Sequence, residues 1–381
     1  MKILYGVAGE GMGHAIRSKV IITELAKKYE VIVLASQRAY KFLAASFPQV
    51  HEIEGERLVY GKGRVKRVRT LLSNLRSLPR VLRVNSRHAR EILRGGWPDV
   101  IITDFESFSG LLAHARRAPL ISIDNMQIIS RCKVEVPWGY KRDYYLTRLV
   151  IRSRVFNAKH YLITTFFYPE VRAKGTYLFP PILREEILQA PRRRGEHILV
   201  YQTAETYEDL LPVLRSMDEQ TFFIYGLKSQ GEEKNLSFRA FDESRFTRDL
   251  ASARAVITNG GFSLIAEAIY LGKPILSIPI KKQFEQVLNA LYVERLGYGK
   301  FSDKIDQDTV HEFFSRLESF EQNLASYRQD GNRLLFKKLD QLLPLDPEGP
   351  SLDPDPYGEG QGPEGCFSDK FLRRLLWLMR I

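Results

Sequence analysis

The sequence predicts an α/β protein made of two doubly wound domains, each with a parallel sheet flanked by helices. The clearest sign is the stretch 255–290, AVITNGGFSLIAEAIYLGKPILSIPIKKQFEQVLNA, where an apolar strand, a Gly-Gly turn, a helix and a second strand follow one another. That order is typical of the right-handed crossover unit of a parallel sheet. Residues 2–28 begin in the same way, and 381 residues are enough for two domains.

Composition indicates a globular protein of a reducing compartment. Hydrophobic residues make up 44% of the chain, and no apolar run is long enough to span a bilayer, so no transmembrane helix is expected. The two cysteines, Cys132 and Cys366, form neither a disulfide framework nor a zinc motif, which suits the cytoplasm. The N-terminal strand runs into glycines and Glu10, so we do not expect a signal peptide.

A glycine-rich loop, GEGMGH at 9–14, joins the first predicted strand at 2–8 to a helix at 15–28. Glycines let the backbone approach a ligand closely. The spacing differs from the G-x-G-x-x-G of dinucleotide-binding proteins, and no acidic residue ends the second strand at 31–35. A dinucleotide site is therefore not the favoured interpretation of this loop.

Positive charge is concentrated between residues 57 and 94. This segment holds twelve Lys or Arg against the single acid Glu91, which is +11 of the formal net charge of +12. From residue 76 the arginines are 4, 3, 4, 3 and 4 positions apart, a stripe on one helix face, and Pro79 is expected to kink or divide that helix. An anionic membrane, another anionic ligand such as a lipid pyrophosphate, or only solvent could face this stripe, whereas the lack of interleaved aromatics argues against nucleic acid. The stripe consists of Arg76, Arg80, Arg83, Arg87, Arg90 and Arg94.

Polar residues end two further strands of the first half. Asp104 follows the strand at 100–103, and Asp124 and Asn125 follow the strand at 120–123. Ligands of parallel sheets sit beyond the carboxyl ends of the strands, so these side chains could contact a ligand; capping of the next helix is the alternative. Aromatic and basic residues at 137–159 indicate a further ligand-binding or membrane surface.

The crossover unit of the second half has the features of a phosphate site. Gly260 and Gly261 lie where its first strand ends and its helix begins. Unpaired backbone N–H groups and the positive end of the helix dipole suit a phosphate there. Glu267, one turn after Ser263, could accept two ribose hydroxyls. An ordinary Gly-Gly turn and helical Glu in an α/β core are the alternative.

Two motifs together resemble one enzyme family. N-G-G-x-S-x-x-x-E-A-x-x-x-G-x-P at 259–274, with E-Q-x-x-N-A at 285–290, resembles the donor-binding signature of nucleotide-sugar glycosyltransferases with the GT-B fold. GEGMGHAIRS at 9–18 is similar to the N-terminal loop of the same group. The branch concerned includes the bacterial N-acetylglucosaminyltransferase that forms lipid II and its small archaeal and bacterial relatives. Asn259 departs from the pattern, since many members have a His there that touches the diphosphate.

The resemblance implies two Rossmann-like domains with a cleft between them. Prolines and charge at 179–195 mark the junction. An acceptor-binding domain is expected over 1–185, a nucleotide-sugar-binding domain over 196–325, and a helix over 326–343 that crosses back to the first domain. Composition predicts a flexible acidic tail at 344–381 that ends in a basic amphipathic helix.

The resemblance also implies roles for individual residues. His14 is the candidate general base, with phosphate binding or helix capping as the alternative, and Glu10 and Asp104 are further catalytic candidates. Asp124 and Asn125 would bind the acceptor. Phe241 would stack on the nucleotide base or serve as an ordinary core residue. The implied donor-binding residues are Gly11, Gly13, Thr203, Phe241, Asn259, Gly260, Gly261, Ser263, Glu267, Glu285, Gln286 and Asn289.

We therefore expect a hexosyltransferase that moves a sugar from a nucleotide donor, UDP-linked, to a lipid-linked or glycan acceptor. The enzyme is expected to be cytoplasmic and peripheral on the inner face of the membrane. No D-x-D motif has a plausible strand-end setting, and Asp353-Pro354-Asp355 lies in the predicted tail, so we expect no metal, no cofactor and inversion in a single displacement. The alternatives are a nucleotide-sugar 2-epimerase and a non-catalytic sugar-nucleotide-binding protein.

Overall fold

The computed structural model describes residues 1–9, 11–55, 60–61, 64–65, 67–202, 207–227 and 230–343. The predicted site residues Glu10 and Thr203 and the predicted tail lie outside them, as do the side chains of 56–75. The chain forms two compact units. Unit 1 comprises Met1–Val134, Arg148–Ile182 and the described residues from Asn332 on, and unit 2 comprises Glu135–Thr147 and Leu183–Gly331.

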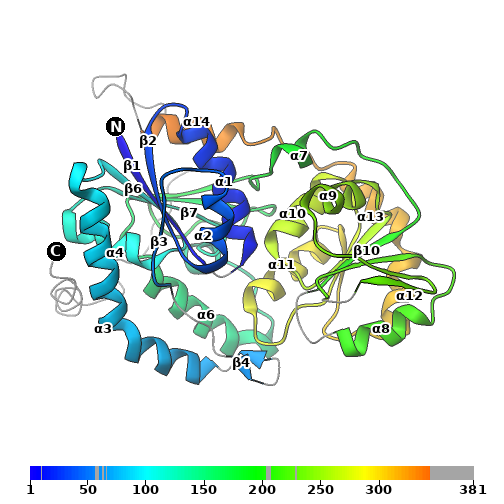
Figure 1. Ribbon diagram of the computed structural model, residues 1–381. Coiled ribbons are helices and arrows are strands. Elements are labelled where there is room, and N and C mark those ends of the chain that lie inside the picture. Colours follow the sequence, from blue (N-terminus) through cyan, green and yellow to red (C-terminus); the bar gives the residue numbers. More distant parts are fainter. Residues whose placement is uncertain are drawn as a thin grey trace. The chain divides into compact units, whose positions relative to one another are not determined.

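Unit 1 contains a seven-stranded parallel sheet in the order β3-β2-β1-β6-β7-β8-β9 (Figure 1). Its strands are β1 (Lys2–Val7), β2 (Glu30–Ala35), β3 (Val50–Glu52), β6 (Val100–Asp104), β7 (Leu120–Asp124), β8 (His160–Thr164) and β9 (Thr176–Phe179). The predicted strands of this half are confirmed, and β9 is an addition at the sheet edge. A two-stranded hairpin, β4 (Tyr60–Gly61) and β5 (Arg64–Val65), stands apart from this sheet.

Helices cover both faces of this sheet because its side chains alternate between two cores. Tyr5 of β1 belongs to the core shared with α1 (Met12–Leu25), α2 (Gln37–Ala44) and α14 (Arg333–Leu342). Leu4, the residue before it, belongs to the core shared with α3 (Arg67–Ile92) and α4 (Ser107–Arg116). Of the other helical segments, η1 (Leu93–Gly95) and α5 (Ile128–Arg131) lie in unit 1, η2 (Trp138–Tyr140) lies in unit 2, and α6 (Lys141–Arg154) begins in unit 2 and ends in unit 1.

Helix α3 and the short helix η1 that follows it present the predicted arginine stripe to solvent, with Arg94 in η1. Leu82 and Ala89 are buried against the sheet, and all six arginines of the stripe are exposed. Pro79 lies inside the helix, which continues through it to Ile92 rather than ending there. Arg80 binds Glu54 at 2.7 Å in an exposed ion pair.

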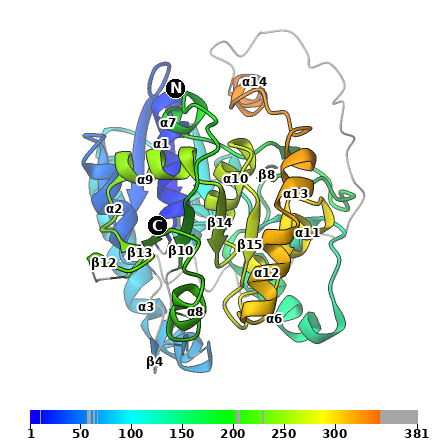
Figure 2. The same cartoon turned by 90° about the vertical axis from the view of Figure 1, so that its right-hand side faces the viewer.

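Unit 2 contains a second seven-stranded sheet, in the order β12-β13-β11-β10-β14-β15-β16, and Figure 2 shows β10, β14 and β15 side by side. All its strand pairs are parallel except that of β12 at the edge. The strands are β10 (Ile198–Tyr201), β11 (Phe222–Tyr225), β12 (Gly231–Glu233), β13 (Leu236–Phe238), β14 (Ala255–Thr258), β15 (Ile275–Ser277) and β16 (Gly299–Phe301). The helices are α7 (Glu185–Leu188), α8 (Tyr207–Arg215), α9 (Glu243–Ser252), α10 (Phe262–Tyr270), α11 (Phe284–Arg295), α12 (Gln307–Ser315) and α13 (Leu317–Leu324).

The helix predicted over 326–343 is shorter in the structure. Helix α13 ends at Leu324, and α14 begins at Arg333 after Gly331, whose φ of 75° lies in the left-handed region that helices exclude. Helix α14 belongs to unit 1, where Leu335 and Leu339 are buried and Lys28 binds Asp340 at 2.7 Å. None of the described helices combines the length and apolarity needed to cross a bilayer.

Each sheet reverses its strand order once. The reversal lies between β1 and β6 in unit 1 and between β10 and β14 in unit 2. The predicted fold class, two doubly wound α/β domains, is therefore confirmed. In such sheets, ligands bind beyond the carboxyl ends of the strands that flank the reversal.

Candidate functional site

The reversal point of unit 1 brings His14, Arg17 and Asp104 together. Val7 at the end of β1 is the register partner of Asp104 at the end of β6. The loop after β1 leads into α1, and His14 lies in the first turn of that helix. Because residues three apart share a helix face, His14 and Arg17 both reach the end of β6.

Arg17 forms a bidentate ion pair with the buried carboxylate of Asp104. Its Nε donates to Oδ2 at 2.7 Å and its Nη2 to Oδ1 at 2.6 Å, while the Ser18 hydroxyl donates to Oδ2 at 3.0 Å. Burial alone would raise the pKa of Asp104, but the charges of Arg17 and His14 outweigh it and lower that pKa to about 2. Asp104 is therefore an ionised hydrogen-bond acceptor at neutral pH.

Asp104 fixes the tautomer of His14. Its Oδ1 lies 2.7 Å from His14 Nδ1, and an ionised carboxylate only accepts, so the hydrogen of the neutral imidazole resides on Nδ1. Arg17 Nη2 also lies 2.6 Å from Nδ1, but two donors do not bond to each other, so both share the Asp104 oxygen. The lone pair is then on Nε2, which can accept a proton.

Phe105 completes the surroundings of His14 and had not been expected there. Its ring stacks on the imidazole with centroids 5.9 Å apart and planes 9° from parallel. Its φ of 58° is a conformation that bulky residues rarely adopt. The guanidinium of Arg154 lies 4.8 Å from the Phe105 ring centroid. A left-handed conformation in a residue other than glycine carries no sequence signal, so the stacking of Phe105 on His14 could not be predicted.

The two predicted acceptor residues have different surroundings. Asn125 joins the cluster, since its Oδ1 accepts from Arg17 Nη1 at 2.6 Å. Asp124 accepts from the Ser122 hydroxyl at 2.7 Å and from the Gln127 backbone N–H at 2.8 Å, so it stabilises its own turn. Burial, followed by the charge of Asp104, raises the pKa of Asp124.

The glycines after β14 have the geometry of an open helix N-terminus. Gly260 has a φ of 90°, and a Cβ there would lie 2.8 Å from the Gln286 carbonyl oxygen and 2.9 Å from Ser277 Oγ. Asn289 braces this turn by donating to the Gly260 carbonyl at 3.0 Å. At Gly261, which precedes α10 without a side-chain cap, a Cβ would meet no atom of the described chain within 4 Å. Space for a ligand therefore adjoins the first amides of α10.

The other predicted donor residues of unit 2 surround this turn or lie on nearby elements. Asn259 donates to the Ile278 carbonyl at 3.3 Å, and Gln286 accepts from the Ile280 N–H at 2.9 Å. Ser263 and Glu285 are half-buried. Phe241 is 56% exposed, which excludes the alternative of an ordinary core residue. In unit 1, Gly11 precedes α1 and Gly13 lies in its first turn.

Glu267 is held in a buried ion pair with Arg184, a residue that the sequence did not single out. Arg184 donates from Nε to Oε1 at 2.8 Å, from Nη2 to Oε2 at 3.0 Å, and from Nη1 to Glu243 at 2.9 Å. Burial raises the pKa of Glu267, and the charge of Arg184 opposes that rise. Arg184 belongs to the proline-rich junction segment, where its neighbour Leu183 is also buried. The segment is therefore packed at this point, and composition alone did not reveal it.

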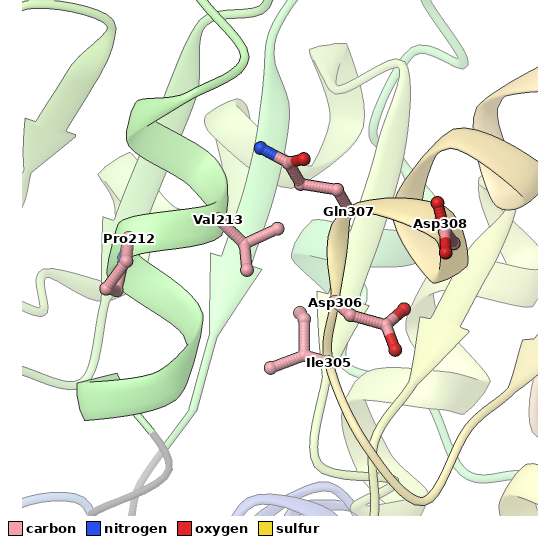
Figure 3. Close-up of a pocket in the computed structure, with 6 residues that line it drawn as sticks. All are labelled: Pro212, Val213, Ile305, Asp306, Gln307 and Asp308. Atoms are coloured by element: carbon pink, nitrogen blue, oxygen red, sulfur yellow. The ribbon is translucent and has the colours of Figure 1, made fainter.

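A cavity of about 450 Å³ in unit 2 lies away from all predicted site residues (Figure 3). Pro212 and Val213 of α8 line one side, and residues 305–308 at the start of α12 line the other. Asp306 caps α12 by accepting from the Thr309 N–H at 2.9 Å. Two carboxylates, those of Asp306 and Asp308, make this cavity unsuited to an anionic diphosphate.

The buried pair predicts a large loss of stability in the variant Arg184→Met. Glu267 would keep a buried charge without its partner, so the free energy of unfolding should fall by about 3–5 kcal/mol in urea titrations. Adding Glu267→Gln should restore much of the loss, because the charge is then gone. The matched control is Arg215→Met, whose pair with Glu233 at 2.8 Å is exposed, so its loss should lower the free energy of unfolding far less. Equal losses for the two single variants would contradict this account.

The lowered pKa of Asp104 predicts how stability depends on pH. The folded pKa of about 2 lies below the ordinary value of 3.8, so the stabilisation is complete above that ordinary value and is lost as pH falls through the folded pKa. Wild type should therefore lose about 2 kcal/mol more than Asp104→Asn between pH ~5 and pH ~2. Denaturant titrations across this range measure the free energy of unfolding of both proteins. A difference between them that stays constant with pH would refute this prediction.

Comparisons with known proteins agree with this geometry. Residues 1–318 match the family model described as glycosyl transferase family 1. An uncharacterized glycosyltransferase of Methanosarcina acetivorans is 26% identical over 332 residues, covering 79% of this chain and 83% of the relative. The UDP-N-acetylglucosamine--N-acetylmuramyl-(pentapeptide) pyrophosphoryl-undecaprenol N-acetylglucosamine transferase 3 of Bacillus cereus is 29% identical over 100 residues, covering 24% of this chain and 28% of that protein.

Solved structures match over both units. The glycotransferase of kitacinnamycin is similar with a TM-score of 0.66 and 16% identity, covering 90% of this chain and 99% of that structure. This likeness confirms the predicted GT-B fold. The matched family model spans most of the chain, which therefore belongs to glycosyl transferase family 1, and the predicted class of enzyme, a glycosyltransferase, is confirmed.

Proposed function

We propose that this enzyme transfers a hexose from a UDP-sugar to an acceptor hydroxyl, with His14 as the general base. The observation that carries the proposal is the 2.7 Å contact between His14 Nδ1 and the buried carboxylate of Asp104. A base must combine a free lone pair with a partner that stabilises its protonated form. His14 has the free lone pair on Nε2, and Asp104 is the partner that stabilises the protonated imidazole.

The proposed reaction is a single displacement. His14 Nε2 takes the proton of the acceptor hydroxyl while that oxygen forms a bond to the anomeric carbon of the donor. The bond from that carbon to the diphosphate oxygen breaks, and UDP leaves with the electron pair. Attack opposite the leaving group inverts the anomeric centre. Asp104 stabilises the imidazolium that forms, and its low pKa keeps the proton on His14.

Donor binding is assigned to unit 2. The uncapped N-terminus of α10 and the open space at Gly261 support a diphosphate there, stabilised as charge develops on it by backbone N–H groups, Ser263 and Asn259. This assignment requires no metal ion. The exposed ring of Phe241 supports base stacking. Glu267 is proposed to accept the ribose hydroxyls while Arg184 orients it. Sugar hydroxyls are assigned to Glu285, Gln286 and Asn289.

Acceptor binding is assigned to unit 1, near Asp124 and Asn125. The acceptor class that we favour is lipid-linked, at the cytoplasmic face of a membrane, with a free glycan as the second choice. Similarity to the Bacillus cereus enzyme, whose name specifies a pyrophosphoryl-undecaprenol acceptor, supports a lipid carrier. The exposed arginine stripe of α3 supports contact with anionic headgroups.

The variant His14→Ala tests the catalytic assignment. Donor binding should be unchanged, because the base does not hold the donor, while kcat should fall about 10²–10⁴-fold. A thermal-shift screen of nucleotide sugars identifies the donor, and acceptor-dependent release of UDP measures the rate. His311→Ala, on the exposed surface of α12, is the matched control and should retain activity. Near-wild-type transfer by His14→Ala would exclude His14 as the base, and UDP release without any acceptor would contradict the transfer itself.

The variant Gly261→Ala tests the donor assignment without disturbing the fold. The φ of Gly261 is −63° and its Cβ would enter open space, so stability should not change. The methyl group would occupy the space assigned to the diphosphate, and the Kd for UDP should rise about tenfold or more by isothermal titration calorimetry. Gly260→Ala should instead lower stability by about 1–3 kcal/mol through its left-handed φ. If the UDP affinity of Gly261→Ala were unchanged, the diphosphate could not be assigned to the space beside Gly261.

A further inference from the structure

An exposed apolar surface lies on the segment of η2 and α6. Trp138 is 83% exposed and Leu149 is 60% exposed. Of the eleven large hydrophobic side chains exposed in the described chain, five lie between residues 138 and 150. We call this group the α6 surface, and it consists of Trp138, Tyr145, Leu146, Leu149 and Val150. Scattered apolar residues on a surface are ordinary, but such a concentration indicates a contact with another apolar phase.

The α6 surface is a helix face distinct from the one that packs on the protein. Tyr145 and Leu149 are four residues apart, as are Leu146 and Val150, so the four side chains lie together. The packing side of the same helix carries Ile151, which is fully buried, and Tyr144, whose ring lies 5.2 Å from that of Phe284. The apolar face is thus additional to what the fold needs.

Cations border the α6 surface. Helix α6 has the sequence KRDYYLTRLVIRSR, in which five basic residues stand against the single acid Asp143. Lys141 and Arg142 are exposed at its start, beside Trp138, and the Lys141 ammonium lies 4.0 Å from that ring. Arg148 and Arg152 follow along one border of the face at helical spacing. Apolar side chains and cations are therefore presented by the same short segment.

We propose that the α6 surface anchors the enzyme to a lipid bilayer that contains anionic lipids. The apolar side chains would enter the boundary between headgroups and acyl chains, and the cations would bind headgroup phosphates. Trp and Tyr suit this boundary because each has an apolar ring and a polar hydrogen-bonding group. A second copy of the same face is disfavoured, since it would bring like charges together. The proposal rests on the membrane-located acceptor of the proposed function.

This anchor differs from the arginine stripe of α3. The stripe supplies exposed charge, but among the large hydrophobic residues of the described part of α3 only Val84 is exposed. Charge alone attracts a protein to a membrane and is weakened by salt, whereas inserted apolar area resists salt. The α6 surface supplies that apolar part.

Vesicle binding by the full chain tests the anchor. Wild type should sediment with vesicles of phosphatidylcholine and phosphatidylglycerol, and less with phosphatidylcholine alone. Trp138→Ser with Leu149→Ser should weaken binding about tenfold or more. The matched control is Tyr168→Ser with Leu334→Ser, which removes two exposed hydrophobic side chains elsewhere and should bind like wild type. Equal vesicle affinity of the two double variants, or no binding by wild type, would overturn the proposal.

A second measurement locates the contact. In the variant with Trp97→Phe and Trp377→Phe, Trp138 is the single tryptophan, and brominated lipids should quench its fluorescence. Absence of quenching while the protein is vesicle-bound would overturn the proposal. The rate of sugar transfer to a water-soluble acceptor distinguishes a failure of the anchor proposal from a failure of the proposed function. The anchor variant should keep that activity, whereas His14→Ala should lose it and still bind vesicles.

Discussion

The buried carboxylate of Asp104 is the constraint on which the first unit depends. An ion removed from water is tolerated only when it is paired and hydrogen-bonded, so Asp104 requires Arg17 and Ser18 on α1. Meeting that requirement fixes α1 against the end of β6. Since His14 precedes Arg17 by one helical turn, the same contact sets the position and tautomer of the imidazole. Stability and the proposed chemistry therefore rely on one ion pair.

The second unit also contains a buried ion pair, but this pair is not the proposed phosphate site of the unit. Its proposed ligand site consists mainly of backbone groups at the start of α10, where a side chain would fill the space that a phosphate needs. The charged groups lie deeper, in the pair of Arg184 and Glu267, which ties the segment after Leu183 to α10. Asn259 is neutral, so the amides and the dipole of α10 provide positive potential at the turn without a charged side chain at this position.

Two exposed surfaces of the molecule differ in their chemistry. Helix α3 offers arginines on a face whose opposite side is buried. Helix α6 offers apolar side chains with cations at their border. Neither surface is needed to complete a core, since both helices already bury another face. The lipid-linked acceptor that we propose would account for both surfaces, because an enzyme that acts on such a molecule must reach the membrane that holds it.

The sequence by itself determined the fold class, the strand ends and the two glycine turns, because apolar periodicity and glycine spacing are local properties. It also located His14, Asp104 and the nucleotide-site motif, but not what holds them. Only the tertiary structure decides contacts between residues that are far apart in the sequence or that have a strained backbone. Such contacts are the ion pair of Arg17 with Asp104, the stacking of Phe105 on His14 and the ion pair of Arg184 with Glu267. For the same reason, composition suggested a loose junction at 179–195, whereas packing buries Leu183 and Arg184 within it.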